Sequence, residues 1–158
     1  MELTQAADQA ATVTLREVVI ANFNEVIRLQ PAPGQENFIA PNVLSIAQSK
    51  VAPNFAPVAI HAGDDVVGFL MFGQDIETLK WHIVRLMIGA QYQRRGYART
   101  ALRQLIDQLA QRPDCEEIII SFMPGNVAAE KLYESLGFEK TGEFDDEGEV
   151  LMRLELKD

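Results

Sequence analysis

Residues 81–110 read WHIVRLMIGAQYQRRGYARTALRQLIDQLA and contain the elements from which the fold can be inferred. The first eight residues are mostly apolar, as expected of a strand that is covered on both faces. Residues 97–111 place their apolar side chains on one helical face, and Pro113 ends the pattern. The segment therefore predicts a buried strand, a glycine-containing turn and an amphipathic helix.

The turn before this helix has the properties of an anion-binding site. Backbone N–H groups at a helix start lack intrahelical partners, and the helix dipole adds positive potential there. Gly96 permits an unusual backbone angle, and Ala98 leaves little side chain in the way. Arg94, Arg95 and Arg99 locally reverse the sign of a chain whose formal net charge is −9. We interpret the turn as a pyrophosphate site; a solvated surface loop is the alternative.

A second segment of functional character follows a buried strand predicted at residues 118–122. It reads NVAAEKLYESLGF, residues 126–138, and predicts a helix that ends at Gly137. Asn126 and Tyr133 are seven positions apart, about two helical turns, so their side chains lie on nearly the same face. One face can thus serve one ligand, although a tyrosine in such a helix is also typical of core packing.

The rest of the pattern completes an α+β domain. Further strands are predicted at 13–18, 57–61, 66–72 and 150–156, and further helices at 22–29 and 42–50. A turn at residues 63–65 joins the second and third strands into a hairpin. The order of elements is strand, two helices, three strands, helix, strand, helix, strand. It predicts a mixed, mostly antiparallel central sheet with helices on both faces.

Composition limits the classes of protein that fit. The 158 residues, 47% of them hydrophobic, predict a flexible leader at residues 1–12 and a single domain at 13–158. With no apolar stretch of about 20 residues and no secretory signal, we expect a cytoplasmic protein without membrane contact. A lone cysteine, Cys115, gives no disulfide and no sign of a metal site. The negative charge disfavours nucleic acid and attracts cations.

Both segments resemble the motifs of one superfamily. Residues 93–98, Gln-Arg-Arg-Gly-Tyr-Ala, resemble the (Gln/Arg)-x-x-Gly-x-(Gly/Ala) motif of the GNAT superfamily of N-acetyltransferases. Residues 126–138 resemble its N-x-x-A-x-x-x-Y-x-x-x-G-F motif. The resemblance implies a sheet with a bulged strand that splays from its neighbour to form a slot for acetyl-CoA, the co-substrate. Homodimers are common in this superfamily, but the sequence fixes no interface.

The resemblance also implies a reaction and a set of residues. The enzyme moves an acetyl group to an amine by direct attack in a ternary complex, and Tyr133 is the general acid that protonates the leaving thiolate. The residues that it assigns to acetyl-CoA are Leu86, Met87, Ile88, Arg94, Arg95, Gly96, Tyr97, Ala98, Arg99 and Asn126.

The general base is not evident from the sequence. Many relatives carry a glutamate in the strand before the pyrophosphate loop, but the stretch here, His82-Ile83-Val84-Arg85, contains no acid. His82 has a suitable intrinsic pKa, although a strand histidine is more often structural. Arg85 in an apolar strand needs an anionic partner or a cleft, and we expect a buried ion pair.

A finer resemblance concerns the acceptor. Residues 35–50, 67–73 and 81–88 together resemble bacterial spermine/spermidine acetyltransferases, which implies a polyamine acceptor, a small-molecule amine. The candidates for binding it are Glu36, Asp75, Glu77 and His82, for which solvated surface positions are the alternative. An amine of a protein, peptide or antibiotic-like compound remains open as the acceptor. A non-catalytic acyl-CoA-binding regulator is the alternative from another class.

Overall fold

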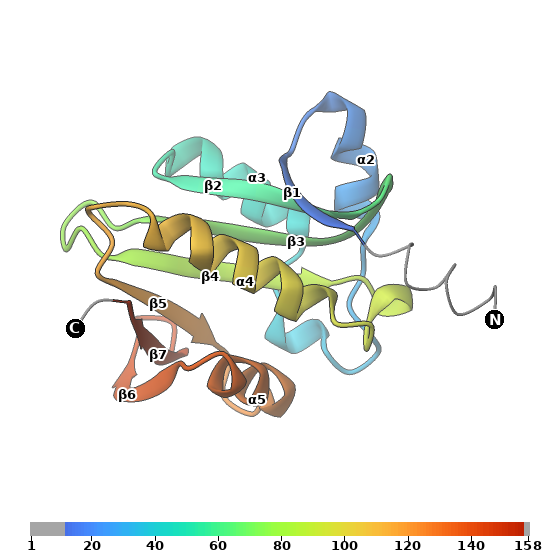
Figure 1. Cartoon of the computed structure of the whole chain (residues 1–158). Coiled ribbons are helices and arrows are strands. Elements are labelled where there is room, and N and C mark those ends of the chain that lie inside the picture. Colours follow the sequence, from blue (N-terminus) through green and yellow to red (C-terminus); the bar gives the residue numbers. More distant parts are fainter. Residues whose placement is uncertain (1–11, 157–158) are drawn as a thin grey trace, which may run out of the picture.

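The computed structural model describes residues 12–156 (Figure 1). The strands are β1 (Val13–Glu17), β2 (Phe55–Ala62), β3 (Asp65–Gln74), β4 (Trp81–Ile88), β5 (Glu117–Phe122), β6 (Glu139–Phe144) and β7 (Val150–Glu155). The helices are α2 (Ile20–Arg28), α3 (Asn42–Val51), α4 (Tyr97–Ala110) and α5 (Val127–Ser135), with 3-10 turns η1 (Glu36–Phe38) and η2 (Ala90–Tyr92). Of the flexible leader predicted at residues 1–12, all but Thr12 lies outside the described residues. Within residues 12–156, no helix is both long and apolar enough to cross a bilayer.

Seven strands form one sheet in the order β1-β2-β3-β4-β5-β7-β6 (Figure 1). Neighbouring strands are antiparallel, except that β4 and β5 run parallel because α4 carries the chain back along the sheet. Helix α4 packs on one face, and α2 and α3 pack on the other. The prediction of a mixed, mostly antiparallel sheet with helices on both faces is confirmed.

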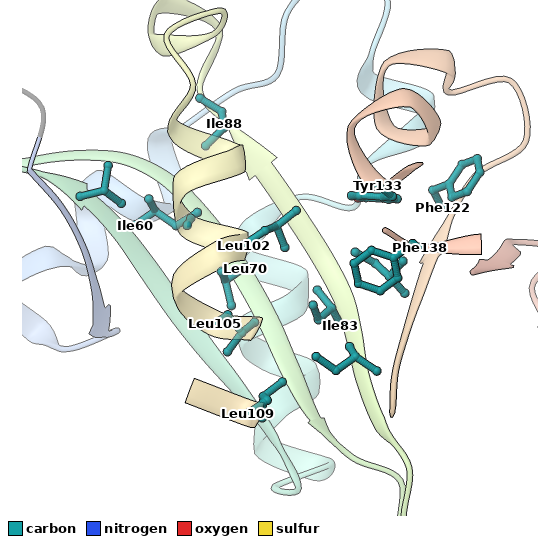
Figure 2. Packing of buried hydrophobic residues seen from close by; sticks show 14 of the residues in the cluster. Ile60, Leu70, Ile83, Ile88, Leu102, Leu105, Leu109, Phe122, Tyr133 and Phe138 are labelled. Atoms are coloured by element: carbon teal, nitrogen blue, oxygen red, sulfur yellow. The ribbon is translucent and has the colours of Figure 1, made fainter. Parts of the chain in front are cut away.

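The core fixes the start of α4 against the sheet. Alternate residues of the central strands, among them Ile60, Leu70 and Ile83, point to one face and pack against Leu102 and Leu105 of α4 (Figure 2). All five side chains are almost fully buried. Each such side chain contributes roughly 1.5–3 kcal/mol of hydrophobic stabilisation. The turn between β4 and α4 is therefore held between two rigid elements.

Strand β4 separates from β5 halfway along its length. The two pair only where residues 81–83 lie opposite residues 118–120. On its other side, β4 pairs with β3 through a register shift that leaves Val84 as an extra residue. Such a bulge bends a strand and increases its local twist. The edge of residues 84–88 that faces β5 is consequently open, which gives the splayed slot that the resemblance to the GNAT superfamily implied.

Strand β6 is the one strand of the described chain that the sequence pattern did not predict. All six of its residues are exposed, so no apolar alternation marks it. It is an edge strand whose pairing with β7 is interrupted between Lys140 and Phe144. The loop that joins β6 to β7, residues 145–149, was therefore also missed.

Candidate active site

The start of α4 presents a row of unpaired backbone N–H groups. Thr100 N donates to Gly96 O at 3.1 Å, but no residue of the described chain accepts a hydrogen bond from the amides of residues 94–99. Arg94 (φ 66°) and Gly96 (φ 82°), the N-cap residue, both have left-handed backbone. A Cβ at Gly96 would meet no atom within 4 Å, so the backbone angle and not space favours glycine. This arrangement at the positive end of a helix suits a phosphate group.

A cavity of about 270 Å³ lies beside these amides, and we call it the arginine cavity. It is bounded by the end of β4, the turn before α4, and α5. Nine of the ten residues assigned to acetyl-CoA line it: Leu86, Met87, Ile88, Arg94, Gly96, Tyr97, Ala98, Arg99 and Asn126. The tenth, Arg95, turns away, because its guanidinium donates to Gln91 O at 3.2 Å and lies 6.0 Å from the Tyr92 ring centroid.

A second cavity of about 260 Å³ adjoins the first, and we call it the glutamate cavity because Glu147 and Glu149 line it. Its other walls come from the segment before α3, the middle of β4 and the end of β5. Four residues line both cavities: Ile39, Leu86, Asn126 and Tyr133. A molecule in one cavity can therefore meet a molecule in the other beside these residues.

A third cavity of about 280 Å³ adjoins the glutamate cavity, and we call it the distal cavity. The two share Val84, Arg85 and Glu147. The remaining walls of the distal cavity come from the end of α3 and from β2 and β3. The three cavities thus follow one another, from the start of α4 past Tyr133 to Arg85.

Tyr133 lies where the arginine and glutamate cavities meet. Its side chain is 5% exposed, and its ring centroid is 5.9 Å from that of Phe122 and 6.1 Å from that of Phe138 (Figure 2). Burial, followed by the charge of Glu149, raises the pKa of the Tyr133 phenol far above its usual value. The phenol therefore carries its proton at neutral pH, and the rings of Phe122 and Phe138 hold it in place at the boundary of the two cavities.

Asn126 is positioned by the cap of α5. Its Oδ1 accepts a hydrogen bond from Ala129 N at 3.2 Å, which satisfies one of the free amides at the helix start. The same residue lies in the wall that the arginine and glutamate cavities share. The cap that begins the helix thus also sets the direction in which Tyr133 enters the cleft.

The loop between β6 and β7 places two carboxylates in the glutamate cavity. Asp145 Oδ1 accepts hydrogen bonds from Glu147 N at 2.9 Å and from Glu149 N at 2.8 Å, which fixes the loop. Burial raises the pKa of Glu149, and the Ser121 side chain in the same cavity partly offsets that rise. The one sequence signal for this loop is its Asp-Asp-Glu-Gly turn at residues 145–148.

Comparison with known proteins identifies the family of this chain. Residues 23–138, most of the chain, match the model of the acetyltransferase (GNAT) family. The chain belongs to the GNAT family. It is therefore an acyltransferase of the N-acetyltransferase type, a class that uses acetyl-CoA as its acetyl donor.

Three relatives illustrate the similarity. The spermine/spermidine N(1)-acetyltransferase of Bacillus subtilis (strain 168) is 28% identical over 151 residues, which cover 92% of this chain and 99% of that protein. The N-alpha-acetyltransferase of Saccharolobus solfataricus is 28% identical over 150 residues, covering 89% and 87%. The crystal structure of the PaiA N-acetyltransferase of Thermoplasma acidophilum in complex with coenzyme A has a TM-score of 0.66 at 15% identity, covering 91% and 99%. The last similarity shows the GNAT fold.

Arg85 lines the glutamate and distal cavities and does not form the ion pair expected from the sequence. Its Nη2 donates to Gln48 Oε1 at 3.0 Å and its Nη1 to Val84 O at 2.9 Å. None of the salt bridges found within residues 12–156 includes it. The expectation of a buried ion pair was wrong because the bulge at Val84 turns Arg85 into an open cleft, where it interacts with the charge of Glu149 without contact.

The candidate acceptor residues of the β3–β4 region lie away from Tyr133. Asp75 Oδ1 accepts hydrogen bonds from Glu77 N and Thr78 N, both at 2.8 Å, and the bond from Thr78 is the main reason that the pKa of Asp75 is lowered. His82 lies near the opposite end of β4 from the open edge, and burial lowers its pKa. None of these three residues, Asp75, Glu77 and His82, lines the arginine, glutamate or distal cavity.

Glu36, the fourth candidate, lies nearer to the cleft but faces another way. Its Oε2 accepts a hydrogen bond from Gly34 N at 2.9 Å. It lines a smaller cavity of about 110 Å³ beside α2 and Met87. The structure therefore brings nine of the ten proposed acetyl-CoA residues and Tyr133 together and leaves Arg95 and the four acceptor candidates outside that group.

Proposed function

We propose that this GNAT enzyme acetylates a primary amine of a polyamine, spermidine or spermine, with acetyl-CoA in the arginine cavity and the amine in the glutamate cavity. The observation that carries the proposal is the common wall at Tyr133. One cavity offers arginines and unpaired amides, which suit phosphates, and the other offers carboxylates, which suit an ammonium group. The two ligands thus have distinct sites that meet at one proton donor.

The residues of the arginine cavity fit acetyl-CoA, which supplies an acetyl group activated as a thioester. The amides of residues 94–99 hold the pyrophosphate, and the side chains of Arg94 and Arg99 add charge to that contact. The open edge of residues 86–88 hydrogen-bonds the amides of the pantetheine arm, as a neighbouring strand does. Asn126 contacts the cofactor at the boundary with the acceptor.

Tyr133 acts as the general acid in a direct transfer. The amine nitrogen forms a bond to the acetyl carbon, the carbon–sulfur bond breaks, and the phenol gives its proton to the departing sulfur. The phenolate then takes the extra proton from the new amide nitrogen, which restores the enzyme. No covalent intermediate on the protein is involved, because Cys115 is fully buried in the core beneath α4.

Charge and shape both support a polyamine as acceptor. The chain carries a formal net charge of −9, and two carboxylates line the cavity on the acceptor side of Tyr133. The adjoining distal cavity lengthens the space available to a linear substrate. The relative from Bacillus subtilis that is named for spermine and spermidine matches nearly end to end at 28% identity.

A peptide N-terminus is the second candidate acceptor, and Arg85 is the observation that favours it. A guanidinium at the junction of the glutamate and distal cavities suits an acceptor that carries a carboxylate. One relative of 28% identity is named as an N-alpha-acetyltransferase. A polyamine has no carboxylate that could pair with Arg85, so Arg85 favours a peptide acceptor and disfavours a polyamine.

A substrate panel tests the proposal. Acetylation by the whole protein is measured for spermidine, spermine, peptides with free N-termini and an aminoglycoside, each with acetyl-CoA. We expect the highest kcat/KM for a polyamine, and peptide preference would favour the second candidate. Normal acetyl-CoA affinity with no acetylated amine would favour a non-catalytic regulator.

A further inference from the structure

The polyamine reaction needs a group that takes a proton from the bound ammonium before it can attack. We propose that Glu149 is this general base: its carboxylate lines the glutamate cavity together with Tyr133 and receives the proton of the acceptor. The inference rests on the proposed function for the acceptor, but the position of Glu149 in the cleft is independent of which amine binds.

The end of β5 positions Glu149 and Tyr133 together. Ser121 lines the glutamate cavity together with Glu149 and favours the charged form of its carboxylate, and the next residue, Phe122, packs its ring against Tyr133. Phe122 also pairs with Val150, the first residue of β7, and Glu149 directly precedes Val150 in the chain. Tyr133 and Glu149 come from distant segments of the chain, and both lie beside Ser121 and Phe122 at the end of β5.

The loop holds Glu149 from its other side. Asp145 Oδ1 accepts the hydrogen bond from Glu149 N at 2.8 Å, so the backbone that carries the carboxylate is fixed. The side chain is partly buried where it enters the cavity, in contrast to the exposed Glu147. A base must be held within reach of the proton that it removes, and both anchors serve that purpose.

The charged groups around Glu149 come from three elements. Arg85 of β4 favours the carboxylate, whereas Asp145 and Glu147 of its own loop oppose it, and the Tyr133 phenol of α5 faces it without charge. Burial is the largest influence, and the pKa of Glu149 is raised overall. A carboxylate of raised pKa accepts a proton more readily than an exposed one, as a general base requires.

Other residues suit this role less well. Glu147 is exposed and lies at the junction with the distal cavity, so it fits an ammonium group further along a polyamine. His82, the base candidate of the sequence, is at the far end of β4. Glu149 is therefore the carboxylate of the glutamate cavity that is both partly buried and anchored beside Tyr133.

The proton balance with two groups is complete. The ammonium of the acceptor gives one proton to Glu149, and the free amine then attacks the acetyl carbon. Tyr133 gives its proton to the sulfur as the carbon–sulfur bond breaks, and it recovers one from the new amide. Glu149 finally releases its proton to water, so that each turnover yields one N-acetylamine, one coenzyme A thiol and one proton.

The test compares Glu149→Gln with Asp146→Asn, an exposed acid of the same loop that lines none of the three cavities. We expect E149Q to lower kcat by about 100-fold, a typical loss for a general base, and D146N to leave it unchanged. Both should bind acetyl-CoA with wild-type affinity by calorimetry. E149Q keeps the shape of the side chain and removes a partly buried charge, so its melting temperature near pH 8 should equal or exceed that of the wild type.

Two further measurements separate a base from a structural residue. In the wild type, kcat should rise with pH through the raised pKa of Glu149, above the value of about 4.3 of an ordinary glutamate, and E149Q should lose this limb. Its defect should also shrink for a fluorinated amine that is unprotonated at neutral pH. If E149Q binds acetyl-CoA normally and keeps the wild-type kcat and pH profile, Glu149 is not the base.

The design keeps the two proposals apart. If the wild type acetylates no polyamine but acetylates a peptide, the polyamine proposal fails, and the E149Q comparison is made with the peptide. If the wild type acetylates polyamines and E149Q does so equally well, only the assignment of the base fails. Should E149Q lose acetyl-CoA affinity, Glu149→Ala replaces it, and an unchanged kcat and pH profile in E149A would likewise overturn the assignment.

Discussion

The arginine and glutamate cavities meet at one tyrosine but are built in opposite ways. The arginine cavity depends on consecutive residues, 94–99, whose backbone amides point outward at the start of one helix. The glutamate cavity depends on single side chains from β4, β5, α5 and two loops. The arginine cavity presents backbone amides, which most substitutions leave in place. The glutamate cavity presents side-chain groups, each of which a single substitution can remove.

This difference matches what each cavity binds in the proposed reaction. The pyrophosphate is the same in every acyl-CoA, so a site made of backbone serves it whatever the neighbouring side chains are. The acceptor differs between GNAT enzymes, so its site has to differ in side chains. We therefore expect substitutions in the glutamate cavity to change kcat or acceptor KM, and substitutions in the arginine cavity to change acetyl-CoA affinity.

The largest effect is expected at the tyrosine that the two cavities share. Tyr133→Phe keeps the ring contacts with Phe122 and Phe138 but removes the acidic proton. We expect kcat to fall by about 100-fold with unchanged acetyl-CoA affinity. Because the pKa of Tyr133 is raised, the wild-type kcat should not decline near pH 10, where ordinary tyrosines ionise. Steady-state kinetics and calorimetry measure both, and an unchanged kcat would remove Tyr133 as the acid.

A smaller effect is expected from the backbone of the arginine cavity. Gly96→Ala places a side chain at φ 82°, which costs about 1–2 kcal/mol or shifts the amides. We expect the Kd for acetyl-CoA to rise about tenfold with little change in the acceptor KM. Gly142→Ala is a matched control, because Gly142 of β6 has the same φ and equally open surroundings. It should lose similar stability and no affinity; equal losses of affinity would show that Gly96 has no local role.

The same difference explains how much of the molecule the sequence could predict. The fold and the arginine cavity depend on local patterns: a buried strand, a turn with Gly96 and an amphipathic helix. Helix starts expose amides by geometry alone, so their place along the chain can be inferred without knowing the tertiary structure. Nine of the ten residues proposed for acetyl-CoA accordingly line one cavity.

The glutamate cavity could not be predicted in this way. Glu149 enters it from a loop that follows β6, and the residues of that strand are all exposed and show no periodicity. Arg85 enters it because a bulge changes the direction of β4, and a bulge leaves no mark in the apolar pattern. The sequence could identify carboxylates such as Asp75, but not which of them the sheet brings to Tyr133.

A third substitution, Glu147→Gln, tests whether the charge of Glu147 helps to bind the acceptor. Glu147 is exposed at the junction of the glutamate and distal cavities, so it should attract a polyamine through a screened contact. We expect Glu147→Gln to raise the KM for spermidine about threefold at low salt, and less at high salt, with kcat and acetyl-CoA affinity unchanged. Glu143→Gln, an exposed position of β6, is the control. A KM that is unaffected at every salt concentration would place the polyamine elsewhere.

The smallest effect on ligand binding is expected from a pair of hydrogen-bonded side chains, Gln35 and Gln93, that connects the segments around the two cavities. Gln93 Nε2 donates to Gln35 Oε1 at 2.9 Å and to Ile88 O at 3.0 Å, and Gln35 Nε2 returns a bond of 3.4 Å. Gln93 begins the pyrophosphate turn, and Gln35 begins the segment that carries Ile39 into both cavities. This amide pair is therefore a link through which acetyl-CoA binding can order the acceptor side.

A double-mutant cycle measures the link. Gln35→Ala and Gln93→Ala should each alter both the acetyl-CoA Kd and the acceptor KM, unlike the substitutions at Gly96 and Glu147. The double variant should lose less than the sum of the single losses, by about 0.5 kcal/mol or roughly twofold, because a partly buried hydrogen bond between neutral groups contributes little more. Strict additivity would mean that Gln35 and Gln93 are not coupled, and that this amide pair does not link the two cavities.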